Sequence, residues 1–482
     1  MITFQPTDLV RILPEIILCG FAILIMVLEP FVPRRRKSWL GWLALVGVLT
    51  AVGGTLRAFQ DAGLAFGRSI AADHFSFYFF YLFLLVAALA LLGSINYLEQ
   101  ENIQHGEFYA LMLMGTAGMC FMAASTDLIM VFIGLEISSI STYILAGFKR
   151  KDALANEASL KYFLLGSFAT AFFLYGIAFI YGLTGTTNLL ELSGRLAHPT
   201  QWTVLARVAL LLMFAGLAFK LSTVPFQIWT PDVYQGAPAP VTAFLSVGPK
   251  AAAFAILLRV FLGGLASAAS LSFWLIWVSA ILTMCLGNLA AIWQTNVKRL
   301  LAYSAIAHAG YVLVGVAAGG HEGTSAVLFY LTAYALMNVG AFVLIAHLAG
   351  NGELSTQIED YTGLAYIKPG TAACLTIFLL SLAGIPTTAG FFGKFFLFRA
   401  AIHSHLIGLT IIALLNSVVS VYYYLRIVVA MYMREGTTRA STASLPMALR
   451  AAMAVSVVGI FYLGLFPNLF LTFSNTAGIP LP

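Results

Sequence analysis

The sequence predicts an all-α polytopic membrane protein with about 14 transmembrane helices. Of its 482 residues, 61% are apolar and only 9% are charged, against about 25% charged residues in an ordinary soluble protein. The mean hydropathy is +0.93, and the apolar residues form long unbroken runs rather than the alternating segments of about 10 residues that a membrane β-barrel needs. These observations exclude a soluble globular enzyme, a disordered chain and a disulfide-built secreted domain.

Each expected span is an apolar run near the length that crosses the hydrocarbon layer, which is about 20 helical residues. In chain order they lie near 9–29, 39–59, 74–97, 107–125, 127–147, 158–183, 204–224, 240–265, 272–293, 300–318, 323–348, 371–402, 407–433 and 448–472.

Basic residues in short loops set the expected orientation. Runs of lysine and arginine at 34–37 and 149–151 are typical of the cytoplasmic side of a membrane protein. With an even number of spans, both termini should then lie on the outer side of the membrane. The net charge of +6 is explained by these loops and does not indicate nucleic-acid binding.

Two of the expected spans are interrupted by proline. The seventh runs into Pro225 and Pro231, and the twelfth contains Gly384-Ile385-Pro386. Proline removes a helix hydrogen bond, and freed backbone groups survive in a membrane only inside protein or beside water. Broken helices of this kind mark the transport site of many transporters, and Lys220 and Lys394 each lie close to one break.

Charged residues within the spans are the main functional candidates, since each costs about 2.5–3.5 kcal/mol at the bilayer centre. A carboxylate and a lysine at one depth can pair, and a lysine that exchanges its proton carries protons without a metal or an organic cofactor. Alternatively, Lys161 can snorkel to the headgroups, and the histidine can be an ordinary core residue. The candidates are Glu136, Lys161, Lys220, Lys250, His308 and Lys394.

Other polar residues are expected to be structural. Arg259 and Arg426 lie nearer span ends and should snorkel or pack, while Glu15 should be solvated at the outer surface. The chain has four cysteines and no CxxC motif, so neither an iron–sulfur cluster nor a zinc site is expected.

Several motifs resemble one family along essentially the whole chain. The centre of the broken seventh span, Pro231-Asp232-Val233-Tyr234-Gln235-Gly236-Ala237-Pro238, is similar to the antiporter-like subunits of the bacterial proton-pumping NADH–quinone oxidoreductase, respiratory complex I, in the form typical of its N subunits. Further similarity lies at 157–163, at 298–304 and at 384–395.

The resemblance implies that helices 4–8 and 9–13 form inverted repeats, each with one broken helix. The expected segments are then 1–106, 107–265, 272–433 and 448–482. By position, Glu136 corresponds to the glutamate of helix five and Lys161 to the helix-six residue. Lys220, Lys250 and Lys394 correspond to the lysines of helices seven, eight and twelve.

The function implied is that of one proton-translocating module in a larger translocase. Flavin, iron–sulfur clusters and the quinone site would belong to partner subunits, and this chain would hold no cofactor. Its partners would be the bilayer, protons and other membrane subunits of complex I, above all the sister antiporter-like subunits. Two alternatives are a subunit of a multisubunit Na⁺/H⁺ antiporter without redox coupling, and a scaffold with vestigial charges. The form of the broken-helix motif, with lysine rather than glutamate at position 394, favours complex I.

Overall fold

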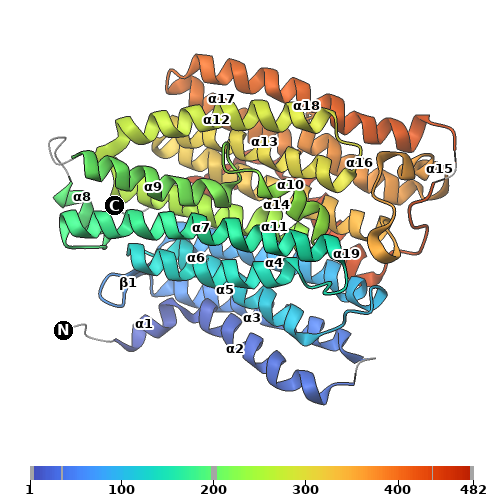
Figure 1. Ribbon diagram of the computed structural model, residues 1–482, viewed down its shortest axis with the longest axis horizontal. Coiled ribbons are helices and arrows are strands. Elements are labelled where there is room, and N and C mark those ends of the chain that lie inside the picture. Colours follow the sequence, from blue (N-terminus) through green and yellow to red (C-terminus); the bar gives the residue numbers. More distant parts are fainter. Residues whose placement is uncertain (1–4, 34–35, 197–202, 437, 478–482) are drawn as a thin grey trace.

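The computed structural model describes residues 5–33, 36–196, 203–436 and 438–477. Figure 1 shows a bundle of long helices that run broadly in the same direction and its opposite. Two of the basic positions used for the predicted orientation, 34 and 35, lie outside the described residues.

The N-terminal segment contributes three long helices and a small hairpin at one end of the bundle. The last of these helices, α4, begins directly after its N-cap residue Asp73. The Asp73 carboxylate accepts a hydrogen bond from the Ser76 amide at 2.8 Å, as an N-cap residue should. The elements are α1 (Pro6–Arg11), α2 (Leu13–Leu28), the 3₁₀ turn η1 (Glu29–Phe31), α3 (Ser38–Gln60), the antiparallel strands β1 (Gly63–Ala65) and β2 (Ile70–Ala72), and α4 (His74–Gln100).

The next segment contains the first broken helix. Aspartate side chains again cap two of its helices, since Asp127 accepts from the Ile129 amide and Asp152 from the Leu154 amide, both at 2.9 Å. Its elements are α5 (Gly106–Ala124), α6 (Leu128–Ala146), α7 (Ala153–Thr184), α8 (Leu189–Arg195), α9 (Val204–Leu221), α10 (Trp229–Gly236), α11 (Ala239–Ile256), the π-helical η4 (Leu257–Gly264) and η5 (Ala266–Ala268).

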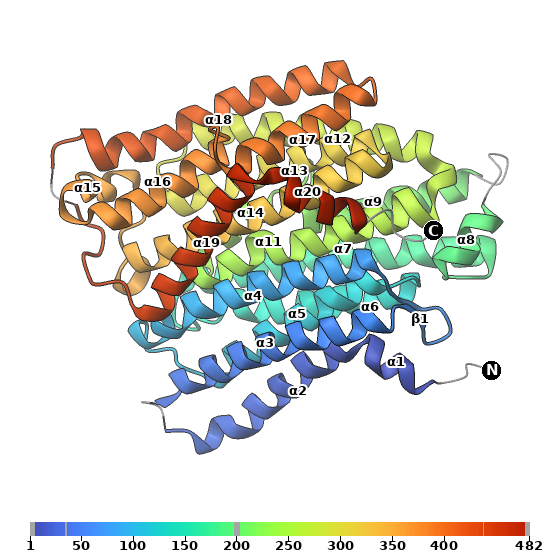
Figure 2. The same cartoon turned by 180° about the vertical axis from the view of Figure 1, so that it is seen from behind.

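The remaining segment contains the second broken helix and the C-terminal helices. Its elements are α12 (Ala269–Ile292), α13 (Val297–Ala318), α14 (Gly320–Leu348), η6 (Asn351–Glu353), η7 (Ile358–Tyr361), α15 (Leu364–Ile367), α16 (Pro369–Ala383), α17 (Ala389–His403), α18 (Ile407–Met433), α19 (Met447–Leu465) and α20 (Pro467–Thr476). Figure 2 shows α19 and α20 crossing the back of the bundle, where α19 packs against both α4 and α14.

The number of membrane-spanning helices agrees with the prediction. Within the described residues, 13 helices are long and apolar enough to cross a membrane. The shorter α16 and α17, of 15 residues each, pack end to end across a break and supply one more span. The prediction of about 14 spans and of two broken helices is therefore confirmed.

Helices α11 and α14 form the centre of the bundle. Every residue of α11 is buried, and α14 packs against α4, α11, α13, α16 and α17. Peripheral helices such as α2, α3 and α18 instead turn large apolar side chains outward, as a helix in contact with lipid does. Polar groups on α11 and on the helices around it are therefore shielded from both lipid and bulk water.

The loops at the two ends of the bundle differ in their basic residues. One end, here called the basic end, carries α15, at the right of Figure 1, and Lys149, Arg150 and Lys298 lie in the loop before α7 and at the start of α13. The opposite end carries the β1–β2 hairpin and α8.

Candidate functional site

The first broken helix is stabilised by side chains that replace its missing hydrogen bonds. Helix α9 ends at Ser222, which has a left-handed conformation with φ of 60°. The indole Nε1 of Trp229 donates to the Phe219 carbonyl at 2.9 Å, and the Val224 amide donates to Thr283 Oγ1 at 3.0 Å. These two bonds satisfy backbone groups that the break frees, as a non-helical segment at membrane depth requires, although Pro225 and Ile228 within the break are exposed.

Lys220 occupies the last turn of α9, where the carbonyl end of a helix favours a cation. Its side chain is 3% exposed, and Nζ lies 4.9 Å from the ring centre of Tyr143 and 5.0 Å from that of Tyr162. These distances are within the range of cation–π contacts. Lys220 is therefore enclosed by aromatic rings rather than by carboxylates.

Glu136 lies on α6 near Lys220 but does not form an ion pair with any described residue. It is half-buried, its Oε1 has no protein hydrogen-bond partner, and its charge acts on Lys220 from beyond contact distance. The expected direct pairing of a carboxylate with a lysine is therefore not made here, because Lys220 turns toward the rings of Tyr143 and Tyr162 instead.

An aromatic path connects Lys220 with Lys250. The ring of Tyr162 stacks on Trp229 with centroids 4.5 Å apart, and Trp229 meets Tyr234 edge to face at 6.2 Å. Lys250 Nζ lies 5.5 Å from the centre of the Tyr234 ring. The Tyr234 hydroxyl is buried without a protein partner, and such a group ordinarily binds water.

Lys250 and His308 meet at the centre of the molecule. Lys250 is 3% exposed and donates from Nζ to the Ala305 carbonyl on α13 at 3.1 Å. His308, on the next turn of α13, lies 2.5 Å from the Tyr330 hydroxyl through Nδ1 and 2.9 Å from the Tyr424 hydroxyl through Nε2. Both ring nitrogens are satisfied, an arrangement that suits a core histidine and also lets protons pass through hydroxyl groups.

Lys394, on α17, binds the end of α16 across the second break. Its Nζ donates to the carbonyls of Leu382 at 3.1 Å and Ala383 at 2.9 Å, which end α16, and to Ser417 Oγ at 3.0 Å. It also lies 5.0 Å from the ring centre of Tyr311. A lysine on one half-helix thus provides the donors that the carbonyl end of the other half-helix lacks.

Two glycines make this contact between the half-helices possible. Gly384 adopts a φ of +89° and lies against the Lys394 side chain, a conformation that other residues rarely adopt. At Gly390, a Cβ would lie 1.8 Å from the Ser381 carbonyl oxygen. The sequence therefore encodes the approach of α17 to α16 as well as the break itself.

Five of the candidate residues thus form one row across the bundle, and all but the half-buried Glu136 are buried. Tyr311 connects His308 with Lys394, since its ring centre lies 5.7 Å from that of His308 and 5.0 Å from Lys394 Nζ. Lys220 reaches Lys250 through the aromatic path, and Glu136 lies at the Lys220 end. We call Glu136, Lys220, Lys250, His308 and Lys394 the buried row.

Lys161 lies outside the buried row. Its side chain is 41% exposed and pairs with Glu157 at 2.6 Å and with Asp232 at 2.7 Å. Asp232 also accepts a hydrogen bond from Arg299 at 2.7 Å. Sequence reasoning missed Asp232 and Arg299 as partners, although an acidic residue inside a broken span was itself a signal that a cation lies nearby.

Of the expectations about structural charges, one is confirmed and one is wrong. Arg259 was expected to snorkel or to pack, and it packs: it is 1% exposed and binds Asp73 through two hydrogen bonds of 3.0 and 2.9 Å. Its partner caps the neighbouring α4, so the guanidinium is satisfied inside the protein. Glu15 is not solvated: α2 packs against α3 and α5, and the carboxylate is 1% exposed without a protein partner.

The described residues contain no group of three histidine, cysteine, aspartate or glutamate side chains that could hold a metal ion. The four cysteines are all unpaired.

The fold and the buried row define an antiporter-like membrane protein. Residues 125–420 match the family described as NADH:quinone oxidoreductase/Mrp antiporter, TM. A curated relative from Solibacter usitatus, NADH-quinone oxidoreductase subunit N 1, is 50% identical over 479 residues, which cover 99% of each chain. The chain belongs to the family of NADH-quinone oxidoreductase subunit N proteins.

Solved structures agree with this assignment. A chain of respiratory complex I from Thermus thermophilus is 34% identical, has a TM-score of 0.81, and is matched over 96% of this chain and 100% of its own length. A chain of the Mrp complex from Dietzia sp. DQ12-45-1b has a TM-score of 0.86 over 98% and 97% of the two chains, but only 22% identity. The second likeness therefore concerns the fold alone.

Proposed function

We propose that this chain is a proton-translocating membrane subunit of NADH-quinone oxidoreductase, and that protons cross it along the buried row. The observation that carries the proposal is the connection of Lys220, Lys250, His308 and Lys394 through buried rings and hydroxyl groups. Four cations or potential cations in an apolar bundle would be costly without such a function. Electron transfer from NADH to quinone takes place in partner subunits, which hold the flavin and the iron–sulfur clusters.

Each member of the buried row has a distinct part in this proposal. Glu136 is a negative charge that favours protonation of Lys220. Lys220 and Lys250 exchange protons with water and with the Tyr234 hydroxyl between them. His308 passes the proton on through its tyrosine partners, and Lys394 releases it at the second break.

The remaining expectations enter the proposal as follows. Residues 107–265 and 272–433 are two inverted repeats, flanked by 1–106 and 448–482, and each repeat contains one of the observed broken helices. Lys161 acts from the rim, where its pairing with Asp232 ties α7 to α10. Other antiporter-like subunits are the neighbours of this chain in the membrane.

The orientation is also a proposal. With its basic end in the cytoplasm, the chain has both termini on the periplasmic side of the bacterial inner membrane. Single cysteines at the exposed positions Arg150 and Glu191 test it with a membrane-impermeant thiol reagent. Intact cells should label only position 191, and labelling of both positions from outside would contradict the orientation.

The functional test is complementation of a bacterium that lacks its own copy of this subunit. Inner-membrane vesicles from the complemented strain should acidify internally when NADH is added, and the response should not depend on Na⁺. The alternative function, a Na⁺/H⁺ antiporter subunit without redox coupling, rests on the shared family description and on a likeness of fold at 22% identity. Na⁺-driven proton movement without NADH, together with no NADH-driven acidification, would support that alternative and overturn the proposal.

A further inference from the structure

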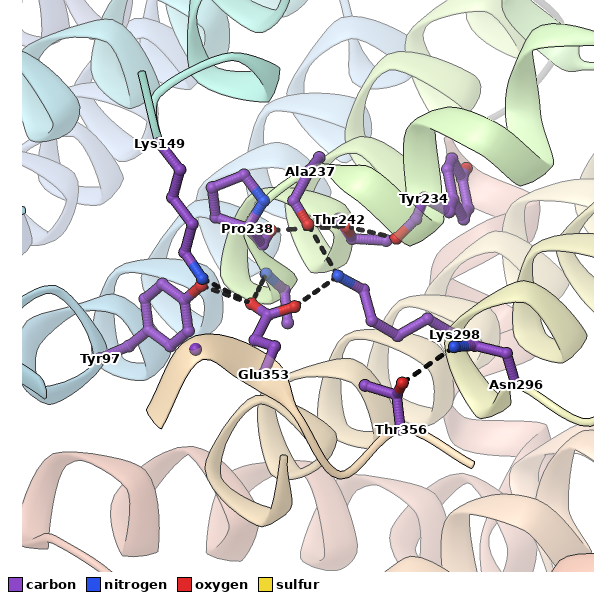
Figure 3. A network of polar contacts seen from close by, with 12 residues as sticks. Tyr97, Lys149, Tyr234, Ala237, Pro238, Thr242, Asn296, Lys298, Glu353 and Thr356 are labelled. Atoms are coloured by element: carbon purple, nitrogen blue, oxygen red, sulfur yellow. Dashed lines mark hydrogen bonds and ion pairs between the residues drawn. The ribbon is translucent and has the colours of Figure 1, made fainter. Parts of the chain in front are cut away.

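The corner between α10 and α11 is held by a buried ion pair from outside both helices. Lys298 donates from Nζ to the Ala237 carbonyl at 2.8 Å, and Glu353 Oε1 accepts from the Ala239 amide at 2.8 Å. The two side chains pair with each other at 2.6 Å. One ion pair therefore satisfies the end of α10 and the start of α11 together (Figure 3).

Glu353 gathers further contacts from separate parts of the chain. Figure 3 shows it between Lys298 on one side and Tyr97 and Lys149 on the other. The Tyr97 hydroxyl donates to it, and Lys149 Nζ lies 3.7 Å from its carboxylate. Burial would raise the pKa of Glu353, but Lys298 and Lys149 outweigh burial and lower the pKa to about 2. Glu353 is therefore a fixed negative charge at physiological pH and does not carry protons itself.

Arg299, the residue after Lys298, binds two side chains of α10. Arg299 donates to Asp232 at 2.7 Å and to Gln235 Oε1 at 3.1 Å. Helix α10 has only eight residues, too few to be stable without outside contacts. Consecutive residues of α13 thus fix both the carbonyl end and the acidic side chain of this short helix.

A small polar cavity lies beside the same corner. Its volume is about 70 Å³, and its lining includes Asp152, Asn296, Lys298 and Glu353. This space suits one or two water molecules with polar partners and excludes a larger substrate. The cavity therefore leaves polar space for water beside the ion pair at the basic end.

The position of α10 matters because it carries the aromatic path. Trp229 and Tyr234, which connect Lys220 with Lys250, are its first and sixth residues. A rotation of α10 would separate Tyr234 from Lys250. A proton path with ring-to-nitrogen distances near 5 Å is sensitive to shifts of about 1 Å.

We infer that Glu353, through its ion pair with Lys298, is a positioning residue for proton transfer, which holds the α10–α11 corner so that Lys220 and Lys250 remain connected. This inference rests on the proposed function of the buried row. Arg299 supports the same helix through Asp232 and Gln235, so residues of the second half of the chain control the geometry of the first.

The test compares three variants in the intact complex. Glu353→Gln removes the charge at nearly constant size, and Glu353→Asp retains it. Glu359→Gln is the matched control, because Glu359 is an exposed carboxylate six positions along the same loop. For each variant, NADH-driven proton pumping is measured per assembled complex, and hydrogen exchange is measured for the peptide that contains the Ala239 amide.

We expect Glu353→Gln to reduce pumping per complex as strongly as Lys250→Met, with faster exchange at Ala239 because a charge-assisted hydrogen bond is lost. Glu353→Asp should recover part of both, and Glu359→Gln should match the wild type. Wild-type pumping by assembled Glu353→Gln would overturn the inference. If Lys250→Met also pumped normally, the proposed function itself would be wrong.

A second variant tests the inference if the complex with Glu353→Gln does not assemble. Asp232 is partly exposed, with 30% of its side chain accessible, so Asp232→Asn should assemble. This variant removes the ion pairs of Asp232 with Arg299 and Lys161, which also fix α10, and it should lower pumping per complex. Normal pumping by assembled Asp232→Asn, without a change in exchange at α10, would count against positional control of this helix.

Discussion

Replacement of Lys394 by methionine separates proton exchange from the structural role of this side chain. The methionine keeps the length and apolar stem of the lysine but cannot donate hydrogen bonds. It therefore leaves the Leu382 and Ala383 carbonyls at the end of α16 without their donor. Ser417 loses the same partner.

The effect on stability is the difference between two opposing terms. A buried carbonyl left without a donor costs about 1–3 kcal/mol, and the pair therefore costs about 2–6 kcal/mol. Removal of a buried ammonium recovers a desolvation free energy of several kcal/mol. Because these terms are similar in size, the free energy of unfolding should change by no more than about 2 kcal/mol, and the complex should assemble.

Proton pumping should fall even if stability is unchanged, since methionine cannot bind and release a proton. In inner-membrane vesicles, dye quenching on addition of NADH should fall strongly for Lys394→Met, with complex content measured on native gels. Lys394→Arg should keep the bonds to α16 yet also pump poorly, because arginine stays charged at any accessible pH. Wild-type pumping by assembled Lys394→Met would refute the assignment of Lys394 to the proton path.

Three further outcomes follow from the same contacts. Glu136→Gln should impair pumping while Glu136→Asp retains more, because the charge acting on Lys220 survives only in the second; equal pumping by both variants in assembled complex would exclude that role. Lys220→Arg should also be impaired, and wild-type pumping would make Lys220 a fixed charge rather than a proton carrier. Arg259→Met should cost about 3–5 kcal/mol by leaving Asp73 unpaired, lowering complex content on native gels with normal turnover per remaining complex; unchanged content would contradict a structural role for this pair.

The residues of the buried row could be selected from the sequence because charged side chains are rare within apolar membrane spans. Lysines at positions 220, 250 and 394 stand in apolar runs where any charge is costly, and proline marks the two breaks. Both features can be recognised without a structure. The contacts of Lys394 with α16 could not be predicted, because a break indicates unsatisfied carbonyls but does not indicate which side chain binds them.

The ion pairs at the basic end could not be predicted in the same way. Glu353, Lys298 and Lys149 lie at helix ends and in loops, where charges are ordinary and usually solvated. Only packing brings residue 353 against the corner at 237–239. The choice between snorkelling and packing for Arg259 stayed open for a related reason, since its partner Asp73 is 186 positions away in sequence.

The most direct test of the buried row is the number of protons pumped per NADH oxidised in the Lys250→Met variant. Lys250 is the point at which the aromatic path from Lys220 meets His308, so its loss should interrupt the row at the centre. The matched control is Lys151→Met, the same change at an exposed lysine of the basic loop. We expect fewer protons per NADH, or coupled NADH oxidation that slows together with pumping, for Lys250→Met alone. An assembled Lys250→Met complex with the wild-type rate and the wild-type number of protons per NADH would contradict proton transfer along the buried row.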